Sequence, residues 1–418
     1  MMQVTEFKCG GVAVGITYNH LVFDGLGAAQ FVNAVAELAR GLAEPSVSPA
    51  WRRDSIPGPP PPAKPTSAPN LTFYRFTPSE FDFPLESIDW VKGRVRSESG
   101  LGCTTFEAVT AMTWRSRTRA VLRSEPDADV RLSFMANVRP VLCDRLGIRG
   151  GYYGNCVYPV GISAPGERVA GESLTALVGL IREAKRTVTA EFTAWLSGDA
   201  GKERFNVPLN YGTLMVTEWS RLGYGDVDYG GWARLRLPRP GRVERPRHVR
   251  LRAAARAEAG GAARDALRRG ATRGGVSERV GEAGLTQAHV YQPRSMLRTY
   301  AHLISKHGRQ LHDHQKAADS GTSLRGDAAG SHRLSFLDRR PEIRLSLDVL
   351  LVFRRGGGED PAKTIREGLS RALVHYYPVA GRIAEPAGGE LAIECSGDGV
   401  WFVEASAEGR LDGFGDWI

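Results

Sequence analysis

The stretch Gln3–Gly25, QVTEFKCGGVAVGITYNHLVFDG, decides the expected fold of this 418-residue chain. Its part from Val4 to Tyr18 is rich in β-branched and aromatic residues and in glycine, which predicts two short strands or one bent strand. From Gly27 to Leu42, apolar residues recur at helical spacing. The residues between these two segments therefore connect a strand to a helix.

His20, Asp24 and Gly25 lie in this connection. A histidine at a strand end projects its ring into a cleft, and its ordinary pKa of about 6.5 lets the neutral ring accept a proton. Asp24 is placed to accept hydrogen bonds from the first N–H groups of the helix, or to pair with an arginine. Gly25 would permit a sharp backbone turn. Because HxxxDG often arises by chance, a buried, hydrogen-bonded histidine is the alternative interpretation.

Further elements are predicted on both sides of a proline-rich connector, Ile56–Pro69. Helical spacing predicts helices over Cys103–Ala120 (N-cap Thr104 or Thr105), Gly171–Phe192 and Ala362–Tyr377. Strands are predicted over Val130–Met135, Cys156–Ile162, Tyr211–Trp219 and Ile343–Phe353. A β-hairpin that turns at Ser396–Gly399 is predicted over Glu390–Glu404.

The net charge of +9 comes from one segment. Residues 231–275 hold 13 arginines, no lysine and three acidic residues, so this segment carries +10 and the rest of the chain −1. The segment has few large apolar residues and cannot build a core. A nucleic-acid interface would need interleaved aromatic residues, and Trp232 is the only one here. We therefore expect residues 231–332 to be an Arg-rich, polar and disordered linker, and expect no nucleic-acid partner.

Composition excludes several other classes of site. No apolar run is long enough for a membrane span, and no secretory signal is visible at the N-terminus. The five cysteines form no CxxC pair, so a disulfide framework or zinc site is not indicated, and Cys9 and Cys156 are expected to be inert. His312 and His314 resemble a metal pair, but a solvated linker explains them better. We expect a cytoplasmic protein without a metal or a membrane partner.

Several longer runs resemble the plant BAHD acyltransferases, which transfer acyl groups from acyl-CoA to alcohols or amines. Besides the opening stretch, these runs are TTFEAVTAMTWRSRTRA (104–120), ANVRP (136–140), GGYYGNCVYPV (150–160) and TLMVTEWSRLGYGDVDYG (213–230). LSFLD (334–338), LSRALVHYYPVAGR (369–382) and LAIECSGDGVWFVEAS (391–406) are similar to the beginning of the same family.

This resemblance implies a fold and a mechanism. The fold is mixed α/β and chloramphenicol-acetyltransferase-like, with two lobes and a channel between them. His20 would act in that channel as general base, with acyl-CoA as co-substrate and a small-molecule acceptor. Asp24 would hold the loop through an arginine, for which Arg139 is a candidate. The donor would be a hydroxycinnamoyl, benzoyl or similar thioester, and the enzyme would be a monomer.

Two departures from the family pattern limit this expectation. Asp228, Tyr229 and Gly230 match the start of the DFGWG signature, but glycine then stands where tryptophan is expected, so we expect an incomplete second lobe. The family's first third also comes last in this chain. A permuted chain could pack residues 333–418 beside the Val4–Tyr18 strand, but we favour a fusion of two neighbouring acyltransferase genes as the origin of this order. A catalytically inactive fusion product is then the alternative to an active acyltransferase.

The expected organisation follows from these runs. Residues 1–55 would end a first lobe that contains HxxxDG, residues 56–70 would cross over, and residues 71–230 would form the second lobe. The linker at 231–332 would precede residues 333–418, the N-terminal part of a first lobe.

Residues 152–155 could border the channel; a tight turn before a strand explains their glycine-containing sequence equally well.

Overall fold

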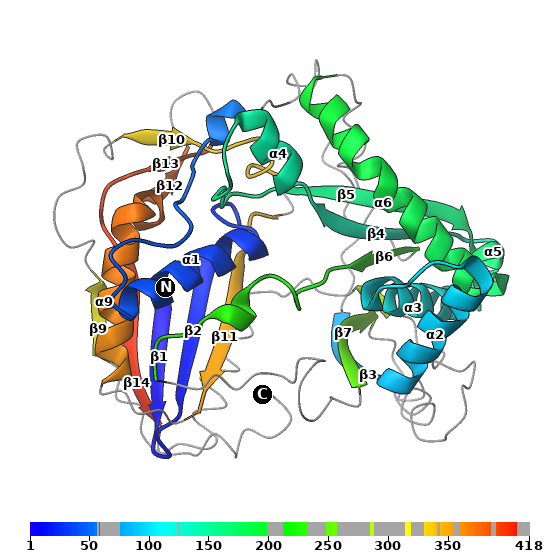
Figure 1. The fold of residues 1–418 in the computed structure, drawn as a ribbon, viewed down its shortest axis with the longest axis horizontal. Helices are drawn as coiled ribbons and strands as arrows, with labels where there is room; N and C mark the ends of the chain where they lie inside the picture. The colour runs from blue at the N-terminus through cyan, green and yellow to red at the C-terminus, as the bar shows by residue number, and fades with distance from the viewer. Residues whose placement is uncertain are drawn as a thin grey trace.

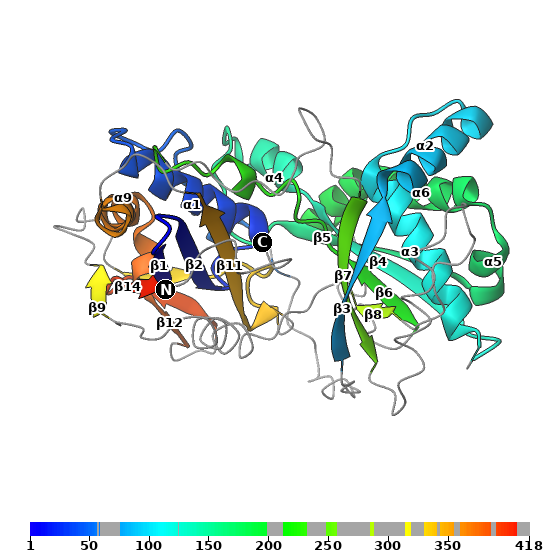
Figure 2. The same cartoon turned by 90° about the horizontal axis from the view of Figure 1, so that it is seen from below.

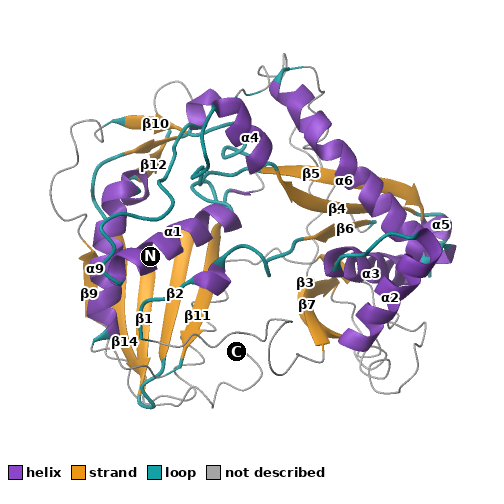
Figure 3. Cartoon of the chain, in the orientation of Figure 1, coloured by secondary structure: helices purple, strands orange, loops and turns teal. Residues whose placement is uncertain are grey.

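The computed structural model describes residues 1–56, 58, 76–123, 125–198, 212–231, 248–256, 285–287, 314–318, 330–340, 343–354, 360–385 and 390–407. The helices and strands of these residues form two lobes, each with its own hydrophobic core (Figure 1, Figure 3). The two-lobed, mixed α/β architecture expected from the sequence is confirmed. None of the described helices combines the length and apolarity needed to cross a bilayer.

A five-stranded sheet with the order β11-β2-β1-β14-β9 forms the centre of the first lobe. The elements of this lobe's main layer are β1 (Met2–Phe7), β2 (Val12–Asn19), α1 (Gly25–Ala39), β9 (His314–Ala318), β11 (Ser346–Phe353), α9 (Pro361–His375) and β14 (Val400–Ala407). β1 pairs antiparallel with β2 and parallel with β14, and β11 pairs antiparallel with β2. The stretch Val4–Tyr18 is therefore built as two strands.

Helices α1 and α9 cover one face of this sheet (Figure 2). Val14 and Ile16 of β2 join a core with Val35 of α1 and Leu369 of α9. A fully buried aliphatic side chain of this kind stabilises the fold by about 1.5–3 kcal/mol. The two helices approach closely at Gly368, where a Cβ atom would lie 2.5 Å from the carbonyl oxygen of Val35. A larger residue there would force the helices apart.

The C-terminal segment completes the sheet that the N-terminal segment begins. Met2 stands opposite Phe402 in the pairing of β1 with β14, and Val14 stands opposite Leu351 in the pairing of β2 with β11. All four side chains are buried in the same core. The structure thus shows β11 and β14 of the C-terminal segment beside the Val4–Tyr18 strands, as expected for the first of the two alternatives.

A small three-stranded sheet, β10-β13-β12, lies at one end of the first lobe (Figure 1). It comprises β10 (Ser331–Arg333), β12 (Arg382–Ala384) and β13 (Ala392–Glu394), with η6 (Tyr377–Ala380) just before β12. The predicted hairpin over Glu390–Glu404 is wrong, because β13 pairs within this sheet while β14 pairs with β1. Gly397 and Gly399 do turn the chain with positive φ. Turn residues mark a change of direction, but they do not fix the partner of either strand.

The second lobe packs helices around two three-stranded sheets, β5-β4-β6 and β3-β7-β8. Its elements are β3 (Phe76–Pro84), α2 (Leu85–Ser99), α3 (Thr105–Val121), β4 (Asp129–Asn137), α4 (Arg139–Leu146), β5 (Val157–Pro165), α5 (Gly166–Gly171), α6 (Leu174–Leu196), β6 (Thr213–Val216), β7 (His248–Arg256) and β8 (Leu285–Gln287). Thr104 is the N-cap of α3, as predicted, and forms a reciprocal capping box with Glu107.

The range 231–332, expected as a linker, contributes β7, β8, β9 and the first two residues of β10 to the sheets. Most of its other residues lie outside the described part of the chain, as does most of the proline-rich 56–70 crossover.

A strap, residues 217–231 with η3 (Tyr224–Asp226), runs from β6 in the second lobe to α1 in the first (Figure 1). Tyr224, Val227 and Tyr229 are buried in the first-lobe core. Asn33 of α1 donates to the carbonyl of Gly223 at 3.1 Å. The strap thus fastens the second lobe to the first on the side of α1.

Candidate active site

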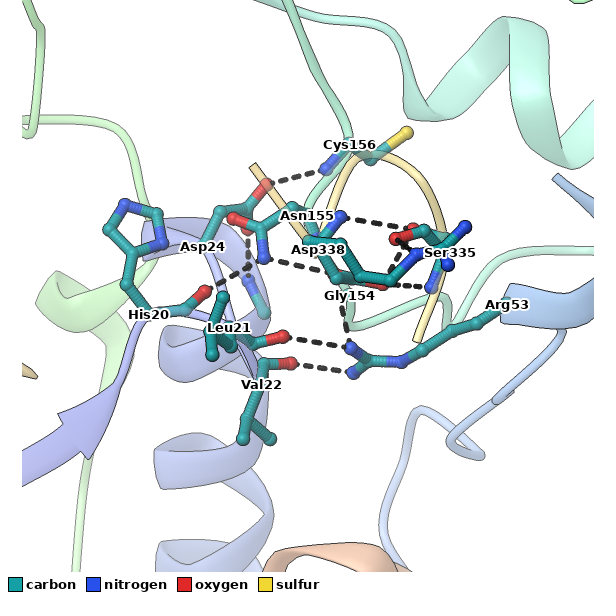
Figure 4. Close-up of polar contacts among 12 residues, drawn as sticks. His20, Leu21, Val22, Asp24, Arg53, Gly154, Asn155, Cys156, Ser335 and Asp338 are labelled. Carbon is teal, nitrogen blue, oxygen red and sulfur yellow. Dashed lines mark hydrogen bonds and ion pairs between the residues drawn. The ribbon is translucent and has the colours of Figure 1, made fainter. Parts of the chain in front are cut away.

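His20 follows the last residue of β2, in a turn that leads into α1. The turn forms because the Asn19 side chain accepts a hydrogen bond from the N–H of Leu21 at 2.9 Å. The His20 ring is half-buried, and within the described residues its buried Nδ1 atom has no hydrogen-bond partner. Figure 4 shows the ring turned away from Asp338 and Arg53. A histidine bound into a packed core, the alternative considered above, would instead have its ring atoms paired.

The main chain of His20 is held at both of its polar atoms. Its N–H donates to the carbonyl of Leu345 at 2.9 Å, and its carbonyl accepts from Asn155 Nδ2 at 2.8 Å (Figure 4). Leu345 precedes β11 and Asn155 precedes β5, so residues from both lobes fix this position. The histidine therefore sits on a backbone that is constrained by both lobes.

Asp24 forms both kinds of contact that the sequence suggested. As the N-cap of α1, it accepts at Oδ1 from the N–H of Gly27 at 2.9 Å. Its Oδ1 also pairs with Arg139 Nη2 at 2.6 Å, and its Oδ2 accepts from the N–H of Cys156 at 3.0 Å. The predicted Asp24–Arg139 ion pair is confirmed, and Asp24 is directed into these contacts rather than toward the His20 ring.

The charges of Asp24 and Arg139 stabilise each other. Burial alone raises the pKa of Asp24, but Arg139 and the two backbone hydrogen bonds outweigh it, so this pKa lies below its ordinary value. Burial lowers the pKa of Arg139, but the neighbouring Asp24 raises it above its ordinary value. Both groups are therefore charged at neutral pH, so Asp24 is not a proton donor there.

Arg139 also fixes the turn formed by residues 152–156. Its Nε donates to the carbonyl of Tyr152 at 3.0 Å and its Nη2 to that of Gly154 at 2.6 Å. Tyr152, Tyr153 and Asn155 are at most 2% exposed, so they pack in the interior instead of lining open space. The tight-turn interpretation of these residues fits the structure better than a channel border.

The connection between β2 and α1, residues 20–24, is called the histidine loop below. A second buried ion pair, which was not predicted, lies on the side of this loop away from the His20 ring (Figure 4). Arg53, in η1 (Arg53–Ser55), pairs with Asp338 at 3.1 Å, and both side chains are fully buried. Burial lowers the pKa of Arg53, but Asp338 raises it above its ordinary value. Asp338 ends the LSFLD run, which resembled the family, but nothing in the sequence connects it with an arginine near the other end of the chain.

The prediction that Gly25 permits a sharp backbone turn is wrong. It is the first residue of α1 and is not among the glycines with positive φ, so no special backbone turn requires it. A Cβ there would lie 2.5 Å from the end of the flexible Leu222 side chain. Gly27 is the more demanding position, because a Cβ would lie 1.9 Å from the carbonyl oxygen of Tyr153.

Asp228, Tyr229 and Gly230 lie at the opposite end of α1 from His20. Tyr229 is buried against Phe353 with ring centroids 5.5 Å apart, and Arg40, after the end of α1, donates to the carbonyl of Asp228. The 15 residues of α1 make it about 22 Å long at 1.5 Å per residue. These residues therefore anchor the strap and do not contact the histidine.

The described residues contain no cluster of three or more side chains that could hold a metal ion. His314 lies in β9, whereas His312 lies outside the described residues. Cys103, Cys143, Cys156 and Cys395 form no disulfide in the described part of the chain. Burial raises the pKa of Cys156 well above its ordinary value, which disfavours a reactive thiolate.

Comparisons with known proteins identify relatives. A family model described as the Transferase family matches residues 1–240 and 328–418. Acyl transferase 9 of Oryza sativa subsp. japonica is 43% identical over 231 residues, which cover 55% of this chain and 53% of that protein. Myricetin 3-O-glucosyl 1,2-rhamnoside 6'-O-caffeoyltransferase AT1 of Crocosmia x crocosmiiflora is 38% identical, covering 55% of each.

A third relative, 3'-N-debenzoyl-2'-deoxytaxol N-benzoyltransferase of Taxus canadensis, is 31% identical over 58% of this chain and 56% of its own length. The chain thus spans about half the length of the curated relatives it matches. Among solved structures, vinorine synthase is 20% identical with a TM-score of 0.40, covering 55% of this chain and 53% of its own.

Proposed function

We propose that this chain, which belongs to the Transferase family of plant BAHD acyltransferases, transfers an acyl group from acyl-CoA to an alcohol or amine. The observation that carries the proposal is His20: a half-buried ring, unpaired at Nδ1 within the described residues, on a backbone held at both polar atoms. The names of the relatives, which include a caffeoyltransferase and an N-benzoyltransferase, favour an aromatic acyl group.

In the proposed mechanism His20 is the general base. Because Nδ1 is buried, Nε2 is the atom that we assign to take the proton of the acceptor hydroxyl or amine. The acceptor then attacks the thioester carbonyl, and the tetrahedral intermediate collapses with cleavage of the C–S bond. The imidazolium can return its proton to the departing CoA thiolate. General-base catalysis of this kind contributes about 10²–10⁴ in rate.

Asp24 and Arg139 support this role without touching the reacting atoms. They close the loop around the N-terminus of α1 and tie it to the 152–156 turn of the second lobe. In the proposed enzyme, acyl-CoA and acceptor approach the ring from between the lobes. The donor is a hydroxycinnamoyl, benzoyl or similar thioester, and no metal ion takes part.

The test is a CoA-release assay on the purified full chain. Several aromatic acyl-CoAs are mixed with a panel of alcohols and amines, and free CoA is measured with a thiol dye. We expect His20→Ala to lower kcat by about 10²–10⁴-fold. The control is His375→Ala, at the end of α9, which should leave kcat unchanged. Release that persists in His20→Ala would exclude this histidine as the base.

A second candidate is an inactive fusion product. The departure from the DFGWG pattern after Gly230 favours it. In that case the folded wild-type chain releases no CoA from any acyl-CoA tested, although circular dichroism shows native structure. Formation of an acylated acceptor, detected by mass spectrometry and absent in His20→Ala, would rule this candidate out.

A further inference from the structure

Side chains from outside the histidine loop bind three consecutive carbonyls of that loop. Asn155 Nδ2 donates to the carbonyl of His20 at 2.8 Å. Arg53 donates to the carbonyls of Leu21 and Val22 at 3.3 and 2.5 Å (Figure 4). Asn155 and Arg53 come from different segments of the chain. They converge here because both bind the same carboxylate.

That carboxylate belongs to Asp338. Its Oδ1 accepts from the backbone N–H and from Nδ2 of Asn155, both at 2.9 Å, and pairs with Arg53 at 3.1 Å. Its Oδ2 accepts from the N–H and the hydroxyl of Ser335 at 3.0 and 2.5 Å. Both oxygens of the fully buried carboxylate therefore have several hydrogen-bond partners. Such networks fix a single arrangement, because a buried polar group that loses its partner is destabilising.

The orientation of the Asn155 amide follows from these contacts. Both neighbours of its Nδ2 atom, the His20 carbonyl and Asp338 Oδ1, can only accept hydrogen bonds. The NH₂ group must therefore face them. An aspartate in its place would have the same shape, but it would present an acceptor to two acceptors.

The contact to His20 differs from ordinary packing because it acts on the backbone of the reacting residue. The N–H of His20 is held by Leu345 and its carbonyl by Asn155, so both peptide groups that flank the ring are fixed. Loss of the carbonyl contact frees the rotation that swings the ring. A misplacement of about 1 Å at a reacting group costs roughly 10²-fold in rate.

We propose that Asn155 and Asp338 are positioning residues that aim the His20 ring through the carbonyl of His20 itself. This inference rests on the proposed function, in which His20 is the base. It also gives the C-terminal segment a role in the chemistry. Asp338 arrives with that segment, far along the chain from His20, and acts on the loop through Asn155 and Arg53. Docking of the two chain ends therefore sets the geometry of the base.

The kinetic test compares Asn155→Ala with Asn33→Ala in the full chain. Asn33 is a matched control, because its amide also bridges two backbone carbonyls, those of Ala29 and Gly223, but outside the loop. We expect Asn155→Ala to lower kcat by about 10–100-fold while KM for acyl-CoA changes less than about twofold. Asn155→Asp should lose as much. Equal loss in Asn33→Ala, or loss confined to KM, would overturn the proposal.

A spectroscopic test does not depend on turnover. In protein labelled at histidine, the ring signals of His20 are assigned by their loss in His20→Ala. We expect these signals to shift in Asn155→Ala and in Asp338→Asn and to stay in place in Asn33→Ala. Asp338→Asn leaves Arg53 unpaired and can prevent folding. Asn155→Ala is therefore the variant that decides whether Asn155 positions the ring. If the His20 ring signals do not move in folded Asn155→Ala, the positioning role is disproved. If they shift, the positioning role is upheld. Both conclusions hold even if the wild type releases no CoA.

Discussion

The two lobes build similar cores from opposite arrangements of the chain. In the second lobe, the elements from α2 to β6 come from one continuous stretch, 85–216. In the first lobe, β1, β2 and α1 lie at the beginning of the chain, whereas β11, α9 and β14 lie near its end. The entropy of closing a loop grows only slowly with its length, so a core can form from distant segments. The difference is that both ends of the chain are essential to the first lobe.

The largest effect is expected from truncating one buried phenylalanine in each lobe. Phe402 of β14 and Phe192 of α6 are both fully buried. Phe402→Ala and Phe192→Ala should each lower the free energy of unfolding by about 3–5 kcal/mol, measured by urea denaturation. The chemical change is the same, so the two variants serve as controls for each other.

Hydrogen exchange then distinguishes the lobes. Phe402→Ala should speed amide exchange in β1 and β2 at the other end of the chain, because Phe402 stands opposite Met2. Phe192→Ala should speed exchange in α3 and β5 and leave β1 protected. Unchanged protection of β1 in Phe402→Ala would show that the chain ends do not share a core.

A smaller effect is expected from acid, through the ion pair that joins the lobes. Asp24 has a pKa below its ordinary value of 3.8, so the unfolded state takes up its proton first as the pH falls. The stability that Asp24 contributes is complete above about pH 4 and is lost as the pH drops from there through the folded pKa.

Unfolding free energies measured from pH 6 to pH 2 test this sign. The slope below about pH 4 should be shallower in Asp24→Asn than in the wild type. The exposed Asp228, changed to asparagine, is the control and should keep the wild-type slope. A wild-type slope in Asp24→Asn would mean that Arg139 does not hold this carboxylate.

The smallest effect is expected at the start of α3, where the second lobe depends on local contacts. Thr104→Ala removes the capping-box hydrogen bond to the N–H of Glu107 and should lower stability by about 1 kcal/mol. Thr104→Ser keeps the hydroxyl group and should therefore retain most of this stability. Thermal unfolding measures both. Exchange protection in the first lobe should not change, and a loss there would show that the lobes are coupled through α3.

The parts of the site that follow from short-range chemistry are predictable from the sequence. The strand-to-helix connection placed His20 and Asp24, and the N-cap role of Asp24 follows from a carboxylate three residues before Gly27. The Asp24–Arg139 pair was found through the family resemblance. The Glu390–Glu404 hairpin failed because a local pattern shows that the chain turns, but not which strand each segment pairs with. Gly25 failed for a different reason, because it takes an ordinary helical conformation as the first residue of α1.

The helix caps, the strand-to-helix connection and the histidine at a strand end could be inferred from the sequence alone, because these features depend on residues within a few positions of one another. Two further features became visible in the folded chain: β14 lies beside β1, and Asp338 holds Arg53 and Asn155 against the histidine loop. Hydrophobic burial is non-directional, and a buried carboxylate accepts any donor that reaches it. Which distant groups meet is therefore fixed by the packing of the whole chain.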